Sequence, residues 1–67
     1  MTPAEFKQAR HTLGLTLSQT ALLLGYKGKH AQQQIRKMQS GESAIRPAQI
    51  RLMRAYLSGY RPEDWPK

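Results

Sequence analysis

The sequence predicts an all-α domain of four short helices, and three observations support this class. Apolar residues recur at intervals of three and four along most of the chain, as one face of an α-helix requires. Thr or Pro stands where each of three periodic segments starts, and Gly follows the end of every one. The chain has 67 residues, enough for one small hydrophobic core. We therefore expect a single compact domain over residues 1–67.

Two capping boxes mark the starts of the first two helices. Thr2 precedes Glu5 by three residues, and Thr16 precedes Gln19 by the same interval. At this spacing the threonine side chain caps a backbone N–H, and the later side chain caps the N–H of the threonine. The predicted helices cover residues 3–13 and 17–24.

Two further helices are expected in the second half of the chain. Ala31, Ile35 and Met38 repeat at four and three, as the buried side of a helix does. Pro47 suits the first position of the last helix, and Gly59 suits its end. These helices cover residues 30–40 and 47–58, and a short irregular tail follows over residues 59–67.

The connection between the second and third helices is basic. It reads Tyr26-Lys27-Gly28-Lys29-His30. The residues alone leave open whether this connection is a loop or an extension of the third helix.

The chain is strongly basic, with eleven Lys and Arg residues against four acids and a net charge of +7. The acids lie near helix ends or in the tail, so that residues 6–41 hold six basic residues and no acid. Such a balance in a small protein indicates a polyanionic partner.

Several function classes are excluded by composition. There is no cysteine, which rules out disulfides and thiolate metal sites and is typical of a reducing compartment. His11 and His30 have no acidic partner at ligand spacing, and no serine has a visible base. We expect no enzyme activity, no metal and no cofactor.

The longest apolar run, residues 21–24, is too short to span a bilayer, so a cytoplasmic protein with no membrane partner is expected.

The third helix carries the candidate binding face. On a helical wheel Gln33, Arg36 and Lys37 point away from the apolar side that holds Ile35 and Met38. Amides and cations without an acid are the groups that contact phosphates and base edges.

Three segments resemble one family of regulators. They are Leu13-Gly14-Leu15-Thr16, then Ala21-Leu22-Leu23-Leu24-Gly25, and finally Gln32-Gln33-Gln34-Ile35-Arg36-Lys37-Met38-Gln39-Ser40-Gly41. With these segments the sequence resembles the XRE, or Cro/C1-type, helix-turn-helix repressors of bacteria and phages. The resemblance covers the four helices from Phe6 to Leu57 and implies a lambda-repressor-like fold. The chain is also similar in size and layout to compact autorepressors of mobile elements, including anti-CRISPR-associated regulators.

The resemblance implies roles for individual residues. It places Gln32, Gln33 and Lys37 in the major groove of double-stranded DNA, and the helical wheel independently exposes Arg36 beside them. Predicted base contacts are therefore Gln32, Gln33, Arg36 and Lys37. Predicted phosphate contacts are Ser18, Gln19, Lys27, Lys29, Ser43 and Arg46.

The chain departs from the family pattern in three places. Leu17 stands where relatives often carry a phosphate-contacting Gln, and the connection from Gly25 to the third helix is about four residues longer than usual. The fifth helix through which many relatives dimerise is missing. The dimer surface therefore stays open. Tyr56, Tyr60 and Trp65 are expected to pack the tail or a dimer contact, and Trp65 is expected on the protein's own core because docking within one chain has the lower entropic cost.

The expected function is a homodimeric repressor that binds an inverted-repeat operator, with no small-molecule effector. The residues leave two alternative functions open. An antitoxin-like or other protein-interaction module would use the tryptophan-bearing tail, and an RNA-binding protein would use the basic face on a hairpin.

Overall fold

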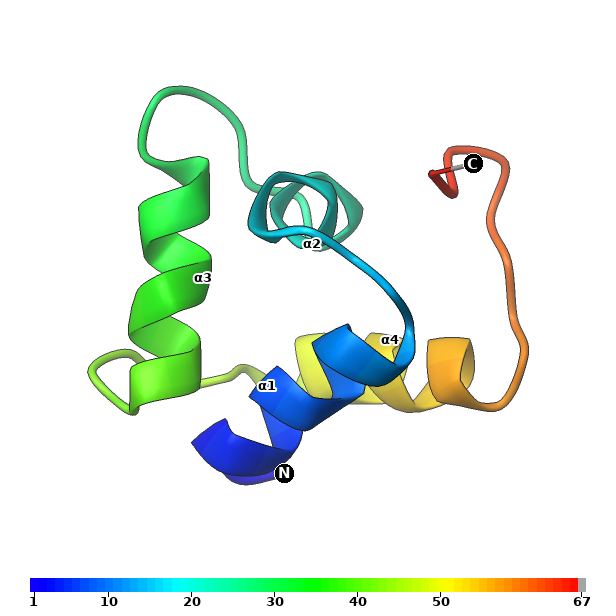
Figure 1. Cartoon of the computed structure of the whole chain (residues 1–67), viewed down its shortest axis with the longest axis horizontal. Coiled ribbons are helices and arrows are strands. Elements are labelled where there is room, and N and C mark those ends of the chain that lie inside the picture. Colours follow the sequence, from blue (N-terminus) through cyan, green and yellow to red (C-terminus); the bar gives the residue numbers. More distant parts are fainter. Residues whose placement is uncertain (67) are drawn as a thin grey trace.

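The computed structural model describes residues 1–66 and folds them into four α-helices without a strand. The helices are α1 (Pro3–Thr12), α2 (Leu17–Leu23), α3 (Ala31–Ser40) and α4 (Pro47–Leu57) (Figure 1). The predicted all-α class with four helices is confirmed. Every helix end lies within one residue of its predicted position. Lys67, the last residue of the predicted tail, lies outside the described residues.

Both predicted capping boxes are present. The Thr2 hydroxyl accepts from the Glu5 N–H at 3.1 Å, and the Glu5 carboxylate accepts from the Thr2 N–H at 2.7 Å. Thr16 and Gln19 repeat this exchange at 3.1 and 2.9 Å. Each box satisfies N–H groups that the first turn of a helix leaves unpaired, so these short-range patterns set where α1 and α2 begin.

The helices enclose one core to which each of them contributes. Its buried members are Phe6, Ala9, Ala21, Ile35, Met38, Met53 and Tyr56. Fully burying a side chain as large as Phe, Ile or Met stabilises the fold by about 1.5–3 kcal/mol. The predicted apolar side of α3 therefore faces the core as expected.

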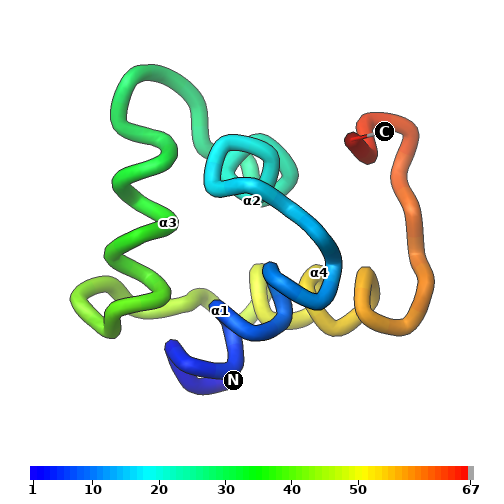
Figure 2. The backbone as a smooth tube through the Cα atoms, viewed as in Figure 1, coloured from blue at the N-terminus to red at the C-terminus, as the bar shows by residue number. Residues whose placement is uncertain are grey.

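The third helix lies at one edge of the molecule. In Figures 1 and 2, α3 runs along the left side, while α2 is seen end-on beside it and α1 and α4 lie together below. The third helix packs against both α1 and α2, and α1 also packs against α4. The chain past α4 rises on the side opposite α3 (Figure 2). Two helices, α1 and α2, thus support α3 from behind and leave its outer side open.

Residues 24–30 form a loop and do not extend α3. Its base is held by Tyr26, whose N–H donates to the Ala21 carbonyl at 2.9 Å. The Tyr26 hydroxyl accepts from the Gln49 amide at 2.8 Å, and the Gln49 side-chain oxygen accepts from the Arg46 N–H at 3.0 Å. Gln49 is buried, and through it the loop is bonded to the start of α4.

The tail packs back on its own chain. The Trp65 ring meets Tyr56 edge-on at 5.0 Å between centroids, and Tyr60 stacks on Tyr56 at 6.0 Å. The Arg61 guanidinium lies 4.2 Å from the centre of the Trp65 ring and donates to the carbonyls of Tyr56 and Tyr60, each at 2.8 Å. Arg61 therefore joins the end of α4 to the tryptophan, and Trp65 packs within the chain as expected.

Burial raises the pKa of Tyr56, so this phenol is neutral in the folded protein at ordinary pH.

No helix within residues 1–66 combines the length and the apolar character that crossing a membrane requires.

Candidate nucleic-acid interface

The outer side of α3 carries the residues that the sequence singled out. Gln33, Arg36 and Lys37 are exposed, whereas Ile35 and Met38 have no exposed surface. Because α3 is a regular helix, side chains four residues apart extend from the same side, so Gln33 and Lys37 lie next to each other. The predicted orientation of this helix is confirmed.

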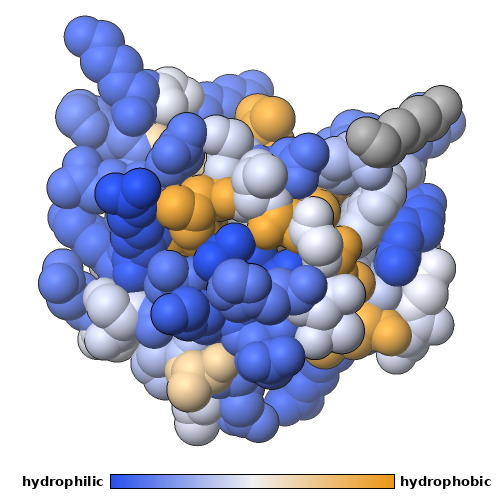
Figure 3. All heavy atoms as spheres, in the orientation of Figure 1, coloured by the Kyte–Doolittle hydropathy of each residue, from blue (hydrophilic) through white to orange (hydrophobic). Residues whose placement is uncertain are grey.

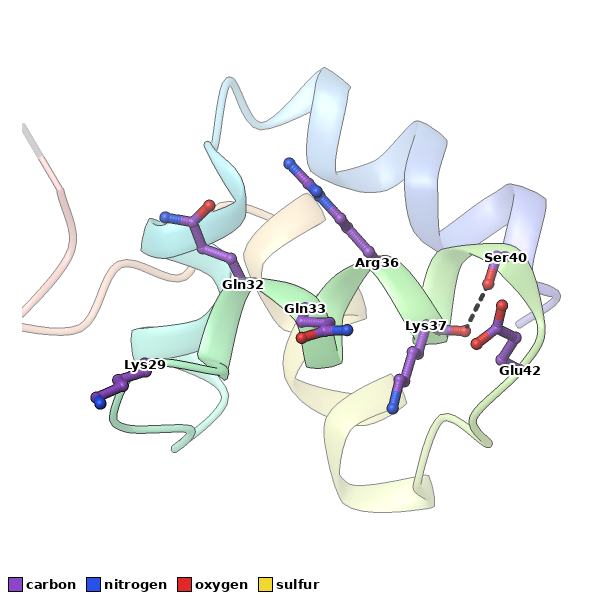
Figure 4. A pocket seen from close by; sticks show the side chains of 7 residues that line it. All are labelled: Lys29, Gln32, Gln33, Arg36, Lys37, Ser40 and Glu42. Carbon is purple, nitrogen blue, oxygen red and sulfur yellow. Dashed lines mark hydrogen bonds between the residues drawn. The ribbon is translucent and has the colours of Figure 1, made fainter.

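These side chains line an open hollow of about 670 Å³. Its full lining is Lys29, Gln32, Gln33, Arg36, Lys37, Ser40 and Glu42 (Figure 4). Lys29 lies at one end and Glu42 at the other, with the amides and cations of α3 between them (Figure 4). In Figure 3 the left edge of the molecule, where α3 lies, is almost entirely hydrophilic.

The helix has dimensions that suit the major groove. It has ten residues, which at about 1.5 Å per residue make a rod about 15 Å long. A B-DNA major groove is about 12 Å wide and admits one α-helix. Its place at an edge of the molecule leaves room for such a groove to close around it (Figure 1).

A side-chain hydrogen bond joins the starts of α2 and α3. The Gln32 amide nitrogen donates to the Ser18 hydroxyl oxygen at 2.6 Å. This contact holds the Gln32 side chain in place but leaves its carbonyl oxygen and a second N–H for another partner. It also leaves the Ser18 proton to donate elsewhere. A predicted base contact and a predicted phosphate contact are therefore held side by side.

Gln19 is engaged in capping α2. Its side-chain oxygen accepts from the Thr16 N–H, and the residue is only partly exposed. The amide N–H groups remain for a phosphate oxygen. Its orientation is thus set by the start of α2.

The basic loop flanks the amino end of α3. Lys27 and Lys29 are exposed, and both line a smaller hollow that also includes Ser18 and Gln32. Lys29 and Gln32 belong to both hollows. The structure therefore brings three of the predicted phosphate contacts together beside the outer side of α3.

Ser43 and Arg46 lie past the opposite end of α3. The Ser43 N–H donates to the Lys37 carbonyl at 3.1 Å, and its side chain is partly buried. Arg46 is exposed and precedes the first residue of α4. Neither residue lines the hollow along α3.

One acid reaches the face that was expected to have none. Glu42 lines the hollow beside Lys37 and Ser40. Gly41 has φ +89, a left-handed conformation that ends α3 and turns the chain back. The bond from the Ser43 N–H to the Lys37 carbonyl closes this turn and brings Glu42 to the end of the face. The helix itself is free of acids, as predicted, but its immediate surroundings are not.

Tyr26 and Gln49 support the site and were missed by sequence reasoning. Gln49 occupies the third position of a helix that starts with proline, where a capping side chain is common. The sequence therefore indicated a capping role for Gln49, although Arg46 is not a usual capping partner. No sequence pattern predicted the hydrogen bond between Gln49 and Tyr26, because the two residues are 23 positions apart.

Neither a protein-family model nor a curated protein nor a solved structure matches the chain. The function is therefore inferred from the residues of the chain and their arrangement.

Proposed function

We propose that the protein is a sequence-specific binder of double-stranded DNA, with α2 and α3 forming a helix-turn-helix unit of the lambda-repressor-like type. In this proposal α3 enters the major groove. One observation carries it: Gln33, Arg36 and Lys37 are exposed on a helix whose opposite side holds Ile35 and Met38, both completely buried. A helix held rigidly by the core can present donors to base edges at fixed positions.

The side chains on this face suit direct reading of bases. A glutamine amide pairs with the N6 and N7 groups of adenine, and arginine or lysine pairs with O6 and N7 of guanine. Each good pair contributes about 1–3 kcal/mol of discrimination against a wrong base. Gln32 and Gln33 would read bases near the amino end of α3, and Arg36 and Lys37 would read those one turn further along.

Phosphate contacts would come from the two flanks of α3. Lys27, Lys29 and Ser18 gather at its amino end, and Arg46 lies beyond its carboxyl end. Such contacts position a protein on the duplex without reading its sequence. The net charge of +7 supports the same partner.

We further propose that two copies bind an inverted repeat and act as a repressor of the operon that encodes them. The recognition helices of such a dimer lie in successive major grooves about 34 Å apart. Occupancy of the operator alone would block RNA polymerase, so no effector is required. This activity belongs in the cytoplasm of a bacterium or a phage-infected cell.

Footprinting on the DNA upstream of the chain's own gene tests the proposal. We expect a protected inverted repeat, and we expect Arg36→Ala to abolish protection at protein concentrations where the natural chain gives it. Arg51→Ala is the matched control, because Arg51 is an exposed arginine of α4 outside the hollow along α3. A structured RNA that competes better than the operator duplex would instead support RNA binding.

A further inference from the structure

Three large apolar side chains stay exposed in the folded chain. Leu22 is 66% exposed, Tyr60 54% and Leu57 44%. Leu22 lines the small hollow beside Ser18, next to the proposed DNA face. Leu57 lies elsewhere, as the last residue of α4. Its exposure leaves apolar surface on a side of the molecule that the proposed DNA contact does not use.

Leu57 lines a groove of about 350 Å³ between α1 and α4. Met1 and Ala9 also line it, and both pack with the hydrophobic core. Polar and charged side chains surround these apolar ones, among them Glu5 and Arg54. An apolar centre within a polar rim is the usual anatomy of a protein–protein interface. No residue of α3 takes part in the groove.

The rim of the groove carries the carboxylate of Glu5 and the guanidinium of Arg54. Hydrogen bonds from Thr2 lower the pKa of Glu5, and the charges of the Met1 amino group and of Arg54 lower it further as smaller effects. Glu5 is therefore ionised at neutral pH. Thr2 engages one oxygen of the carboxylate at 2.7 Å, which leaves the other oxygen for a second donor. The groove thus presents an acid and a base on opposite walls.

We propose that a second copy of this chain docks in the groove and forms the dimer. A two-fold axis through the groove places Glu5 of each copy opposite Arg54 of the other, and Leu57 of each against the apolar centre of the other. A surface that carries both members of a complementary pair matches itself under two-fold symmetry, which is the arrangement of a closed homodimer. The proposal rests on the function proposed above in that an inverted repeat requires two copies. Docking here leaves both α3 helices free.

Sedimentation of the full chain over a concentration series, without DNA, tests the interface. We expect a monomer–dimer equilibrium that Leu57→Glu weakens at least about tenfold, because the interface would bury an unpaired carboxylate. Leu22→Glu is the matched control. It places the same charge at a more exposed leucine outside the groove and should leave the dissociation constant unchanged.

A double-mutant cycle on the charged pair provides a second test. Glu5→Gln keeps a side chain that can complete the capping box, as Gln19 does in α2. Glu5→Gln and Arg54→Gln should each weaken dimerisation about two- to fivefold, and the double variant no more than either alone. Circular dichroism verifies that each variant is folded. If Leu57→Glu does not fold, this cycle decides the question.

The outcomes separate this inference from the proposed function. A chain that stays monomeric at all concentrations, or a dimer unaffected by Leu57→Glu and by the charge substitutions, would overturn the interface even if operator DNA is protected. A dimer that Leu57→Glu disrupts, in a protein that protects no DNA, would support the interface and overturn the proposed function.

Discussion

Gln33 and Lys29 line the same hollow but offer different chemistry to DNA. The amide of Gln33 presents a donor and an acceptor in a fixed order, which a particular base can match. The Lys29 ammonium is a point charge that interacts equally well with any phosphate. Two exposed residues that line one hollow are thus expected to have separable effects on binding.

Substitution of these two residues should separate specificity from general affinity. Gln33→Ala should cost about 1–3 kcal/mol on the operator and reduce discrimination at one base pair. Lys29→Ala should weaken binding to all duplexes and reduce the slope of log affinity against log salt by about one. Binding titrations over a salt series, on the operator and on single-base variants of it, measure both effects. Identical effects of the two substitutions would refute the assignment of Gln33 to the groove.

The loop after α2 depends on a contact made by another helix. Tyr26 at its base is bonded to the buried Gln49 of α4, while Lys27 and Lys29 extend from it into solvent. A loop that is anchored on one side only would lose more conformational entropy on contacting a phosphate backbone. The hydroxyl of Tyr26 is therefore expected to matter for both stability and DNA affinity.

Tyr26→Phe removes this hydroxyl and retains the ring. The Gln49 amide then loses its acceptor, so the free energy of unfolding should fall by about 1–3 kcal/mol. Affinity should fall to the same degree on operator and unrelated DNA, because we propose that the loop contacts phosphates only. Urea unfolding and binding titrations measure the two effects. Tyr60→Phe, at a 54% exposed tyrosine, is the control. Equal behaviour of the two variants would show that the hydrogen bond to Gln49 contributes nothing.

Charge is distributed unevenly over the whole molecule. The cations of α3 and the loop border one hollow, Glu42 lies at its end, and Glu63 and Asp64 lie in the tail. At about 0.1 M salt an exposed charge acts over about 10 Å, so a carboxylate influences DNA binding only if it lies near the contact. The position of each acid therefore matters more than the net charge of +7.

Two glutamate substitutions that raise the net charge by the same amount allow this to be measured. Glu42→Gln should strengthen binding to unrelated duplex about two- to fivefold at low salt, because the carboxylate lines the hollow along α3 where we propose that DNA binds. Glu63→Gln changes the net charge equally but lies in the tail, so it should have no effect. The effect of Glu42→Gln should vanish near 1 M salt, where the screening length is about three times shorter. Equal strengthening by both variants would show that only total charge matters.

The elements of the fold and the outward side of α3 were predictable because short stretches of chain determine them. A capping box joins residues three apart, and a helical wheel needs only ten residues to show that Ile35 and Met38 lie opposite Lys37. Each glycine stop is likewise a property of one backbone position, as the φ of +89 at Gly41 illustrates.

The tertiary structure alone decided how these elements support one another. The bond between Ser18 and Gln32 joins residues 14 positions apart, and the bond between Tyr26 and Gln49 joins residues 23 apart. Packing likewise decided the exposure of Leu57, an apolar residue at the end of α4 that remains 44% exposed. Periodicity reports which side of a helix is apolar, but only the packing of other helices against that side determines how much of it is covered.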